Sequence, residues 1–356
     1  MVTQLSWAQR VRKAGDYVRR GDLSGLIAEI AAFLAWKGVV RAAPTRTGRA
    51  PAPPAASGPT RTQAEATYWA QADLKCMRRS SWCNFQRLGP MALLEMTGGK
   101  TSDANRLIAD TMQCAARENL RGLVLGCGDM QGEHAAFLNP YLSFAEIDAY
   151  DINEQAFDQA RAVTRSAGLT VNLKVGDANW LELPADTYHL AVVYHSYHHF
   201  ARVDWVARQI NRSLVPGGVF YLVDYIGPPR LQLTRRQLDH AQLLLEALPA
   251  DRRRDMHGEI RQVIESVRPD MLSPDEAIAS DQILSAVQRH LRVVWQYNWA
   301  GLLYPLLEGI SFNFDENEPA DCALIDYFFA LDRVLCRSGR IEPNFTITLT
   351  TKKPDA

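Results

Sequence analysis

Short apolar runs alternate with amphipathic segments through the middle of this 356-residue chain. The segments between the runs have helical spacing, as in residues 153–168, which end at Gly168. Strands that alternate with helices form a parallel sheet joined by right-handed crossovers. The pattern therefore predicts a doubly wound α/β fold. The apolar runs, each predicted to be a strand, cover residues 122–126, 145–152, 170–177, 189–195 and 218–226.

Helical patterns also flank this central region. Residues 64–85 and 102–119 precede the first strand, and we expect both segments to cover the sheet. The stretch 229–292 is charged and contains no strand pattern, so we predict a helical cap inserted there. Two further strands are predicted at 292–299 and 344–353, and a helix is predicted between them at 321–337.

The N-terminal part differs from the rest in charge and composition. Residues 1–61 hold ten Lys and Arg against three acidic residues, although the whole chain has a net charge of −1. Residues 43–61 contain five prolines and no large apolar side chain, which is typical of a linker. We therefore expect a basic helical extension over 1–42, a linker over 43–61 and one domain over 62–356.

The apolar run from Leu23 to Val40 is interrupted by Glu29 and Lys37, so we read it as an amphipathic helix rather than a membrane span. Such a helix can fold back on the domain, pair with a protein partner or a second subunit, or rest weakly on an anionic membrane.

Composition excludes several classes of protein. Apolar residues make up 47% and charged residues 22%, as in ordinary globular proteins. The net charge gives no basic surplus, so we expect no nucleic-acid partner. The six cysteines show no metal-binding spacing, which favours a reducing cytoplasm and predicts no metal site.

Three loops that follow predicted strands carry residues suited to a nucleoside ligand. In such sheets, ligands bind at the carboxyl ends of the strands. The first loop runs from Gly126 to Glu133, and its glycines allow close approach of the backbone to a ligand. Asp151 follows the second strand and is placed either to hold ribose hydroxyls or to cap the next helix. Asp177 follows the third strand and either accepts from an adenine amine or serves as a turn residue.

Together these loops resemble the nucleoside-binding sequence of class I S-adenosylmethionine-dependent methyltransferases. The likeness extends to residues 195–199 (HSYHH), after the fourth strand, and to residues 214–218 (LVPGG), before the fifth. It implies a Rossmann-like, mostly parallel seven-stranded sheet whose last strand is antiparallel, with S-adenosylmethionine as cofactor. The cofactor-binding residues that it implies are Gly126, Cys127, Gly128, Glu133, Asp151, Ile152, Gly176, Asp177 and Ala178.

Two positions depart from the family pattern. An acidic residue is usual where this chain has Val124, and a glycine is frequent where it has Met130. In a loop of this variant type, Glu133 is expected to orient the methionine ammonium. The departures keep open a second interpretation, in which the protein binds the nucleoside or a partner without catalysis.

The resemblance also indicates a methyl acceptor site near the histidines. If the acceptor is a hydroxyl, a general base assists, and we expect His195 first and His199 second in that role. His198, Tyr225 and Arg230 are expected to contact the substrate, although histidines at a helix start can equally be packing residues. Further candidates to frame the acceptor are Tyr68, Trp69, Trp82, Arg236, Trp295, Tyr297, Trp299 and Tyr304, most of which we expect in the core.

We therefore expect a methyltransferase acting on a small-molecule or glycan acceptor, with a homodimer as one possible assembly. A nicotinamide-dependent oxidoreductase is the enzyme alternative. Gln131 argues against it, because a dinucleotide fingerprint requires a glycine at that position.

Overall fold

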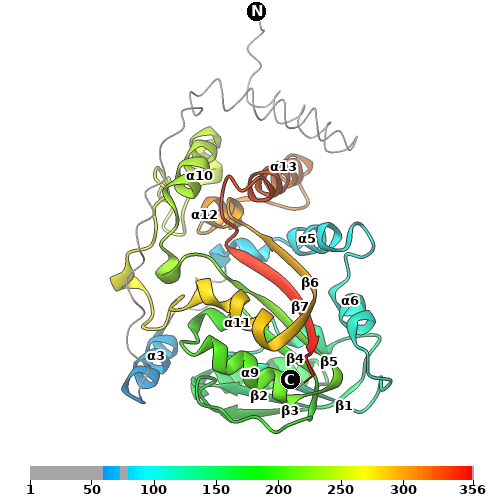
Figure 1. Cartoon of the computed structure of the whole chain (residues 1–356). Coiled ribbons are helices and arrows are strands. Elements are labelled where there is room, and N and C mark those ends of the chain that lie inside the picture. The colour runs from blue at the N-terminus through cyan, green and yellow to red at the C-terminus, as the bar shows by residue number, and fades with distance from the viewer. Residues whose placement is uncertain (1–58, 73–78, 355–356) are drawn as a thin grey trace, which may run out of the picture.

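The computed structural model describes residues 59–72 and 79–354, and it contains a seven-stranded sheet with helices on both faces (Figure 1). The strand order is β3-β2-β1-β4-β5-β7-β6. The strands are β1 (Leu120–Leu125), β2 (Phe144–Asp151), β3 (Val171–Val175), β4 (Tyr188–Tyr194), β5 (Leu214–Tyr225), β6 (Leu291–Trp299) and β7 (Phe345–Lys352).

The pairing of the strands confirms the predicted fold. Strands β1 to β5 pair in parallel, and β7 lies antiparallel between β5 and β6. The order reverses at β1, whose neighbours are β2 and β4, so the carboxyl ends of these strands open on a crevice. The loops that follow β1, β2 and β3 all leave the sheet at this edge.

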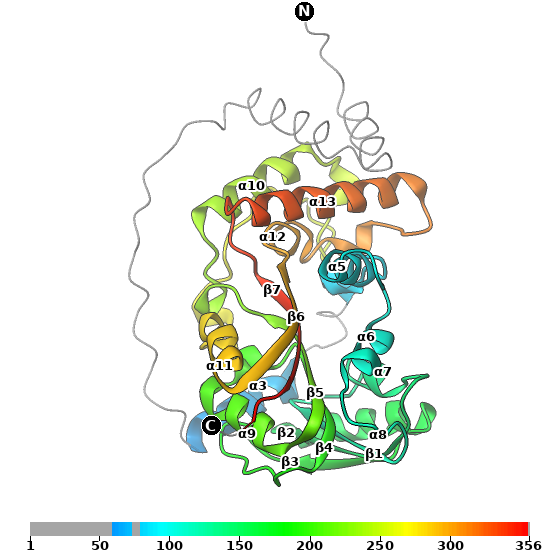
Figure 2. The ribbon, with the colours of Figure 1, turned by 45° about the vertical axis from the view of Figure 1, so that its right-hand side comes forward.

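Helices cover the sheet on two sides (Figure 2). In the view of Figure 2, α9 and α11 lie on one side of the sheet, and α6, α7 and α8 lie on the other. The helices are α3 (Pro59–Gln71), α5 (Leu88–Thr97), α6 (Ala104–Thr111), α7 (His134–Phe137), α8 (Phe157–Ser166), α9 (Val203–Ser213), α10 (Arg235–Ala247), α11 (Ile283–His290), α12 (Leu303–Leu307) and α13 (Pro319–Arg337).

Alternating side chains along the strands divide the core into two clusters. Leu123 and Leu125 of β1 point into the cluster that contains α9 and α11. Val124, between them, belongs to the other cluster, which α5, α6 and α13 complete. Strands buried on both faces read as continuous apolar runs, which is why the sequence located them so well.

The N-terminal boundary differs from the expected one. Helix α3 begins at Pro59, inside the linker expected over 43–61, because proline is well suited to the first turn of a helix. The extension expected over 1–42 lies outside the described residues. Helix α3 ends at Gln71, and a short 3₁₀ turn at Trp82–Asn84 lies at the end of the segment 64–85, for which we expected helical structure.

The segment 229–292 is less helical than expected and does not form one cap. Helix α10 lies with α12 and α13 at the top of the molecule in Figure 1. Helix α11, at the other end of the segment, packs against α9 and belongs to the layer that covers the sheet. Most of the chain between these two helices consists of turns and extended segments, with one isolated bridge between Arg254 and Ile260.

Within the described ranges, none of the helices combines the length and the apolar character that crossing a bilayer requires. The five cysteines in the same ranges are all free thiols.

Candidate active site

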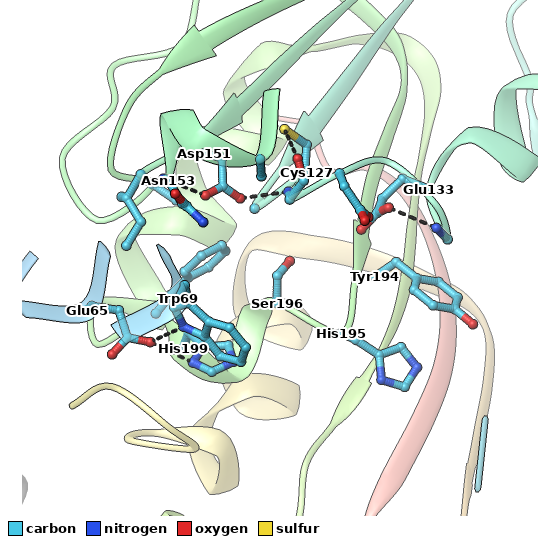
Figure 3. Close-up of a pocket in the computed structure, with 18 of the residues that line it drawn as sticks. Glu65, Trp69, Cys127, Glu133, Asp151, Asn153, Tyr194, His195, Ser196 and His199 are labelled. Carbon is cyan, nitrogen blue, oxygen red and sulfur yellow. Dashed lines mark hydrogen bonds and ion pairs between the residues drawn. The ribbon is translucent and has the colours of Figure 1, made fainter. Parts of the chain in front are cut away.

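A pocket of about 470 Å³ opens at the carboxyl ends of β1, β2, β3 and β4 (Figure 3). Its volume is in the range of small-ligand sites in proteins. The structure brings to this pocket every cofactor-binding residue that the sequence indicated. These residues are Gly126, Cys127, Gly128, Glu133, Asp151, Ile152, Gly176, Asp177 and Ala178.

The side chain of Asp151, at the end of β2, connects the loops that follow β1 and β2. Its carboxylate accepts one hydrogen bond from the backbone N–H of Gly128 and one from that of Asn153, both at 2.8 Å. A carboxylate has about four lone-pair positions, so each oxygen can still accept from a ligand. Burial raises the pKa of Asp151, against the two backbone hydrogen bonds, which favour its charged form. The side chain is therefore fixed in place and retains capacity for two hydroxyl donors.

Two glycines shape the loop after β1. A Cβ on Gly126 would lie 2.5 Å from the Cβ of Ser196, so only glycine lets this loop pass the turn after β4. Gly128 has φ +45°, and a Cβ there would have no protein atom within 4 Å. The pocket surface beside Gly128 is thus open backbone that a ligand can approach closely.

Met130, where the family often has glycine, keeps the left-handed backbone that the loop requires. It adopts φ 63° and is completely buried, and the loop closes through its N–H to the carbonyl of Cys127 at 2.8 Å. Left-handed backbone is costly for a residue other than glycine, and it persists where packing fixes it. The departure from the family pattern therefore leaves a loop of defined geometry.

Glu133 is a buried acid without a cationic partner among the described residues. Burial raises its pKa to about 8, opposed by a backbone hydrogen bond from Gly132 at 3.2 Å. Asp129 and Asp151 raise it further through their charges. At neutral pH the group is mainly protonated, and a ligand ammonium beside it would stabilise the carboxylate.

Asp177 is held in a fixed orientation at the end of β3. One oxygen accepts from the N–H and the side-chain amide of Asn179, at 2.9 and 2.8 Å. The other accepts from the hydroxyl of Thr62 at 2.6 Å. Thr62 belongs to α3, so this helix reaches the part of the pocket that lies at the end of β3.

His195 comes directly off β4 and lines the pocket. It has φ 54°, and its N–H donates to the carbonyl of Val223 at 2.8 Å. Its Nε2 lies 3.8 Å from the sulfur of Cys83. Burial lowers the pKa of His195 to about 4, which outweighs the opposite effect of Asp224. The imidazole is therefore neutral at physiological pH and able to accept a proton.

Asp224, at the end of β5, organises the turn that carries the histidines. Its buried carboxylate accepts from the backbone N–H groups of Ser196 and Tyr197, at 2.9 and 2.7 Å. It also contacts Nδ1 of His198 at 2.5 Å. These bonds fix the positions of His195 and His199 on either side of Ser196, as Figure 3 shows.

Three residues expected at the substrate lie outside this pocket. His198 is buried between Asp224 and Glu276. The hydroxyl of Tyr225 donates to the carbonyl of Pro228 at 3.0 Å, and the Arg230 guanidinium donates to four backbone carbonyls, such as that of Ser273 at 2.9 Å. All three residues thus support the loops behind the pocket.

The sequence analysis missed most of the wall that α3 forms. Thr62, Glu65 and Trp69 line the pocket together with Ser81, Cys83 and Asn84. Glu65 is buried, and its carboxylate accepts from the Trp69 indole at 2.6 Å and from the Ser273 hydroxyl at 2.9 Å. A spacing of four places Glu65 and Trp69 on one helix face, which was the available signal. Of the aromatic candidates, Trp69 lines the pocket, whereas Trp82 and Trp299 pack in the core.

The strand order and the pocket at the carboxyl ends of the strands define a Rossmann-like α/β domain. Residues 123–218 match the family model for a methyltransferase domain. This part of the chain is similar to methyltransferase domains.

A curated relative and two solved structures are similar to this chain. An uncharacterised methyltransferase of Bacillus subtilis, YcgJ, is 28% identical over 123 residues, which is 34% of this chain and 46% of the relative. The crystal structure of that protein is 21% identical and covers 70% of this chain and 98% of its own, with a TM-score of 0.36. An S-adenosylmethionine-dependent methyltransferase from Mesorhizobium loti is 16% identical, covers 69% of this chain and 95% of its own, and has a TM-score of 0.37. The aligned stretch thus spans less than half of the curated relative.

Proposed function

We propose that this protein is an S-adenosylmethionine-dependent methyltransferase that methylates a hydroxyl of a small molecule or a glycan. The observation that carries the proposal is the convergence of Asp151, Asp177 and Glu133 on one pocket at the switch point of the sheet. Three acids at the ends of three strands provide acceptors for ribose hydroxyls, an adenine amine and an ammonium group.

The pocket residues fit S-adenosylmethionine in shape and in charge. Asp151 would hold the ribose, Asp177 the adenine amine and Glu133 the ammonium. Gly128 leaves open backbone where a side chain would intrude. Glu133 supports the fit most directly, because burial raises the pKa of this acid to about 8 and a cation beside it would stabilise its charged form. When bound, the cofactor supplies a methyl group on a sulfonium, which is already electrophilic.

The protein's part in the reaction is to orient the acceptor, exclude water and remove a proton. His195 is neutral and faces the pocket, so we assign it as the base that accepts the hydroxyl proton. His199 lines the same pocket and is the second candidate. Helix α3 closes one side of the site with the Trp69 ring, which contacts the ring of His199 edge-on at a centroid distance of 5.2 Å.

Calorimetric titration of the full-length protein with S-adenosylmethionine and with NAD tests the class of ligand. We expect binding of S-adenosylmethionine only. Binding of NAD alone would overturn the assignment in favour of an oxidoreductase. A following turnover assay, with tritiated S-adenosylmethionine and a panel of hydroxylated metabolites and glycans, separates an enzyme from a protein that only binds the nucleoside.

A further inference from the structure

Beside the pocket, three side chains place metal-ligand atoms around a common point. The Nε2 atom of His198 lies 3.3 Å from one carboxylate oxygen of Glu276, and Nε2 of His199 lies 3.9 Å from the other. One ligand atom from each residue falls within 4.8 Å of the other two. Ligand atoms of a tetrahedral zinc ion are separated by about 3.3 Å, so small side-chain rotations suffice to enclose an ion.

In both histidines, a carboxylate lies beside Nδ1, the ring nitrogen that does not face Glu276. Nδ1 of His198 contacts Asp224 at 2.5 Å, and Nδ1 of His199 lies 3.1 Å from Glu65. In metalloproteins, a carboxylate commonly orients a ligating imidazole in this way and strengthens it as a ligand. Here the arrangement occurs twice, and in both cases the remaining Nε2 faces Glu276.

The cluster is buried and rich in negative charge. His198 is 8% exposed, and the side chains of His199 and Glu276 are 15% and 14% exposed. Three carboxylates, those of Glu65, Asp224 and Glu276, surround the two imidazoles. The guanidinium of Arg230, the nearby cation, is directed to backbone carbonyls. Buried carboxylates require compensation, which either two imidazolium groups or one divalent cation with neutral imidazoles provides.

We propose that His198, His199 and Glu276 bind one divalent cation of the zinc type. Two imidazole nitrogens and one carboxylate oxygen are a common ligand set for zinc, with the fourth position left for water. This departs from the expectation of no metal. The ligands are spread over residues 198–276, so no short Cys/His spacing could reveal them in the sequence.

Such an ion would connect three distant segments of the chain. Its ligands come from the turn after β4 and from the loop that precedes α11, and Glu65 links it to α3. Because His199 and Glu65 also line the pocket, the ion would fix the pocket wall. The proposal does not rest on methyl transfer, and with the ion bound His199 is a ligand, which leaves His195 as the candidate base.

The test uses the untagged full-length protein, treated with EDTA and transferred to metal-free buffer. Zinc chloride is titrated in competition with a chromophoric chelator, in the absence of S-adenosylmethionine. We expect one equivalent bound with a dissociation constant below about 1 μM, weakened at least 100-fold in His199→Gln and Glu276→Gln. His257→Gln is the matched control, because His257 is an exposed histidine outside the cluster. Circular dichroism confirms that each variant is folded.

Cobalt(II) provides a second readout that does not depend on the stability of one variant. The cobalt-loaded wild-type protein should show visible d–d absorption of a four- or five-coordinate nitrogen and oxygen site, and His199→Gln should lose it. Wild-type binding no tighter than that of His199→Gln would overturn the proposal. The cluster would then be a network of contacts between the two histidines and the carboxylates around them. Equal loss of binding in His257→Gln would also overturn it by revealing adventitious surface binding.

Discussion

At the scale of single residues, the site depends on acids whose environments differ. Asp151 is fixed by two backbone N–H groups, whereas Glu133 has one weak backbone partner and a strongly raised pKa. Burial is common to both, so the difference comes from hydrogen bonds that favour the charged form. Asp151 is thus built to accept hydrogen bonds, and Glu133 to respond to a cation.

Asp151→Ala should weaken binding of S-adenosylmethionine at least tenfold. Each hydrogen bond from a ribose hydroxyl to this carboxylate contributes roughly 1.5–3 kcal/mol. Calorimetry measures the affinity, and circular dichroism checks that the loop after β1 still allows folding. Asp158→Ala, an exposed acid on α8, is the control. Unchanged affinity in Asp151→Ala would remove this residue from the site.

Binding of S-adenosylhomocysteine near pH 7 should release a proton from Glu133. The folded-state pKa of about 8 keeps the free acid protonated, and a ligand ammonium shifts it to the carboxylate. Calorimetry in two buffers of different ionisation enthalpy counts the protons released. Glu133→Gln should release fewer protons than the wild type at the same pH. Equal counts in both proteins would show that the ammonium does not reach Glu133.

His195→Ala should lower kcat by roughly 10²–10⁴-fold and leave cofactor affinity unchanged. Because burial lowers the pKa of His195 to about 4, the wild-type rate should fall with acid only near that pH, well below the usual range of histidine. The pH–rate profile, measured with an acceptor found in the metabolite screen, checks both points. A variant as active as the wild type would leave His195 a packing residue.

At the scale of elements, α3 determines one side of the pocket although it precedes the sheet by about fifty residues. Thr62 donates to Asp177, and Trp69 contacts His199, and all four residues line the pocket. The side chains of Arg61 and Asp275 form an ion pair that holds the start of the helix. Helix α3 thus contributes to the pocket with residues that follow the linker expected over 43–61, and Arg61 of that linker pairs with Asp275, which lines the pocket.

Trp69→Ala should weaken binding of S-adenosylhomocysteine about three- to tenfold, because the pocket loses an apolar wall and its contact with His199. Thr67→Ala, on the exposed face of the same helix, should bind as the wild type does. Calorimetry under identical conditions compares the two variants. If both bind normally, α3 does not close on the ligand.

At the scale of the whole molecule, buried carboxyl groups join the C-terminal helices to the rest. Asp332 of α13 accepts from the N–H groups of Ala300 and Leu302 at 2.9 and 2.7 Å, and burial raises its pKa to about 6. Glu308 accepts from the N–H of Trp82 at 3.1 Å, and burial raises its pKa to about 7. These groups connect distant segments of the chain, and because their pKa values are raised, they lower the free energy of unfolding as they ionise with rising pH.

Glu308→Gln should make the protein more stable above pH 7 than the wild type. Because the folded-state pKa of Glu308 exceeds the ordinary value of 4.5, the folded protein binds a proton more tightly, and wild-type stability falls as pH rises from 4.5 to about 7. The penalty is on the order of 3 kcal/mol. Urea unfolding at pH 5 and pH 8 measures it. The exposed Glu182→Gln should reproduce the wild-type slope, and a Glu308→Gln slope equal to the wild type would contradict the prediction.

The amino-acid sequence alone was enough to predict the sheet, its seven strands and the loops that line the pocket. Those features are local, because the apolar runs, the glycines and the acids after each strand lie next to one another in the chain. Parallel pairing then brings Gly126, Asp151 and Asp177 to one edge without further information.

The packing of the folded chain determines which other side chains reach the carboxyl edge of the sheet. The choice among His195, His198 and His199 depends on Asp224, which lies 25 or more residues away and buries His198. The wall formed by α3 and the cluster around Glu276 depend on contacts such as that between Glu65 and His199. Local patterns carry no record of these contacts, because the packing of helices and loops across long separations in sequence creates them.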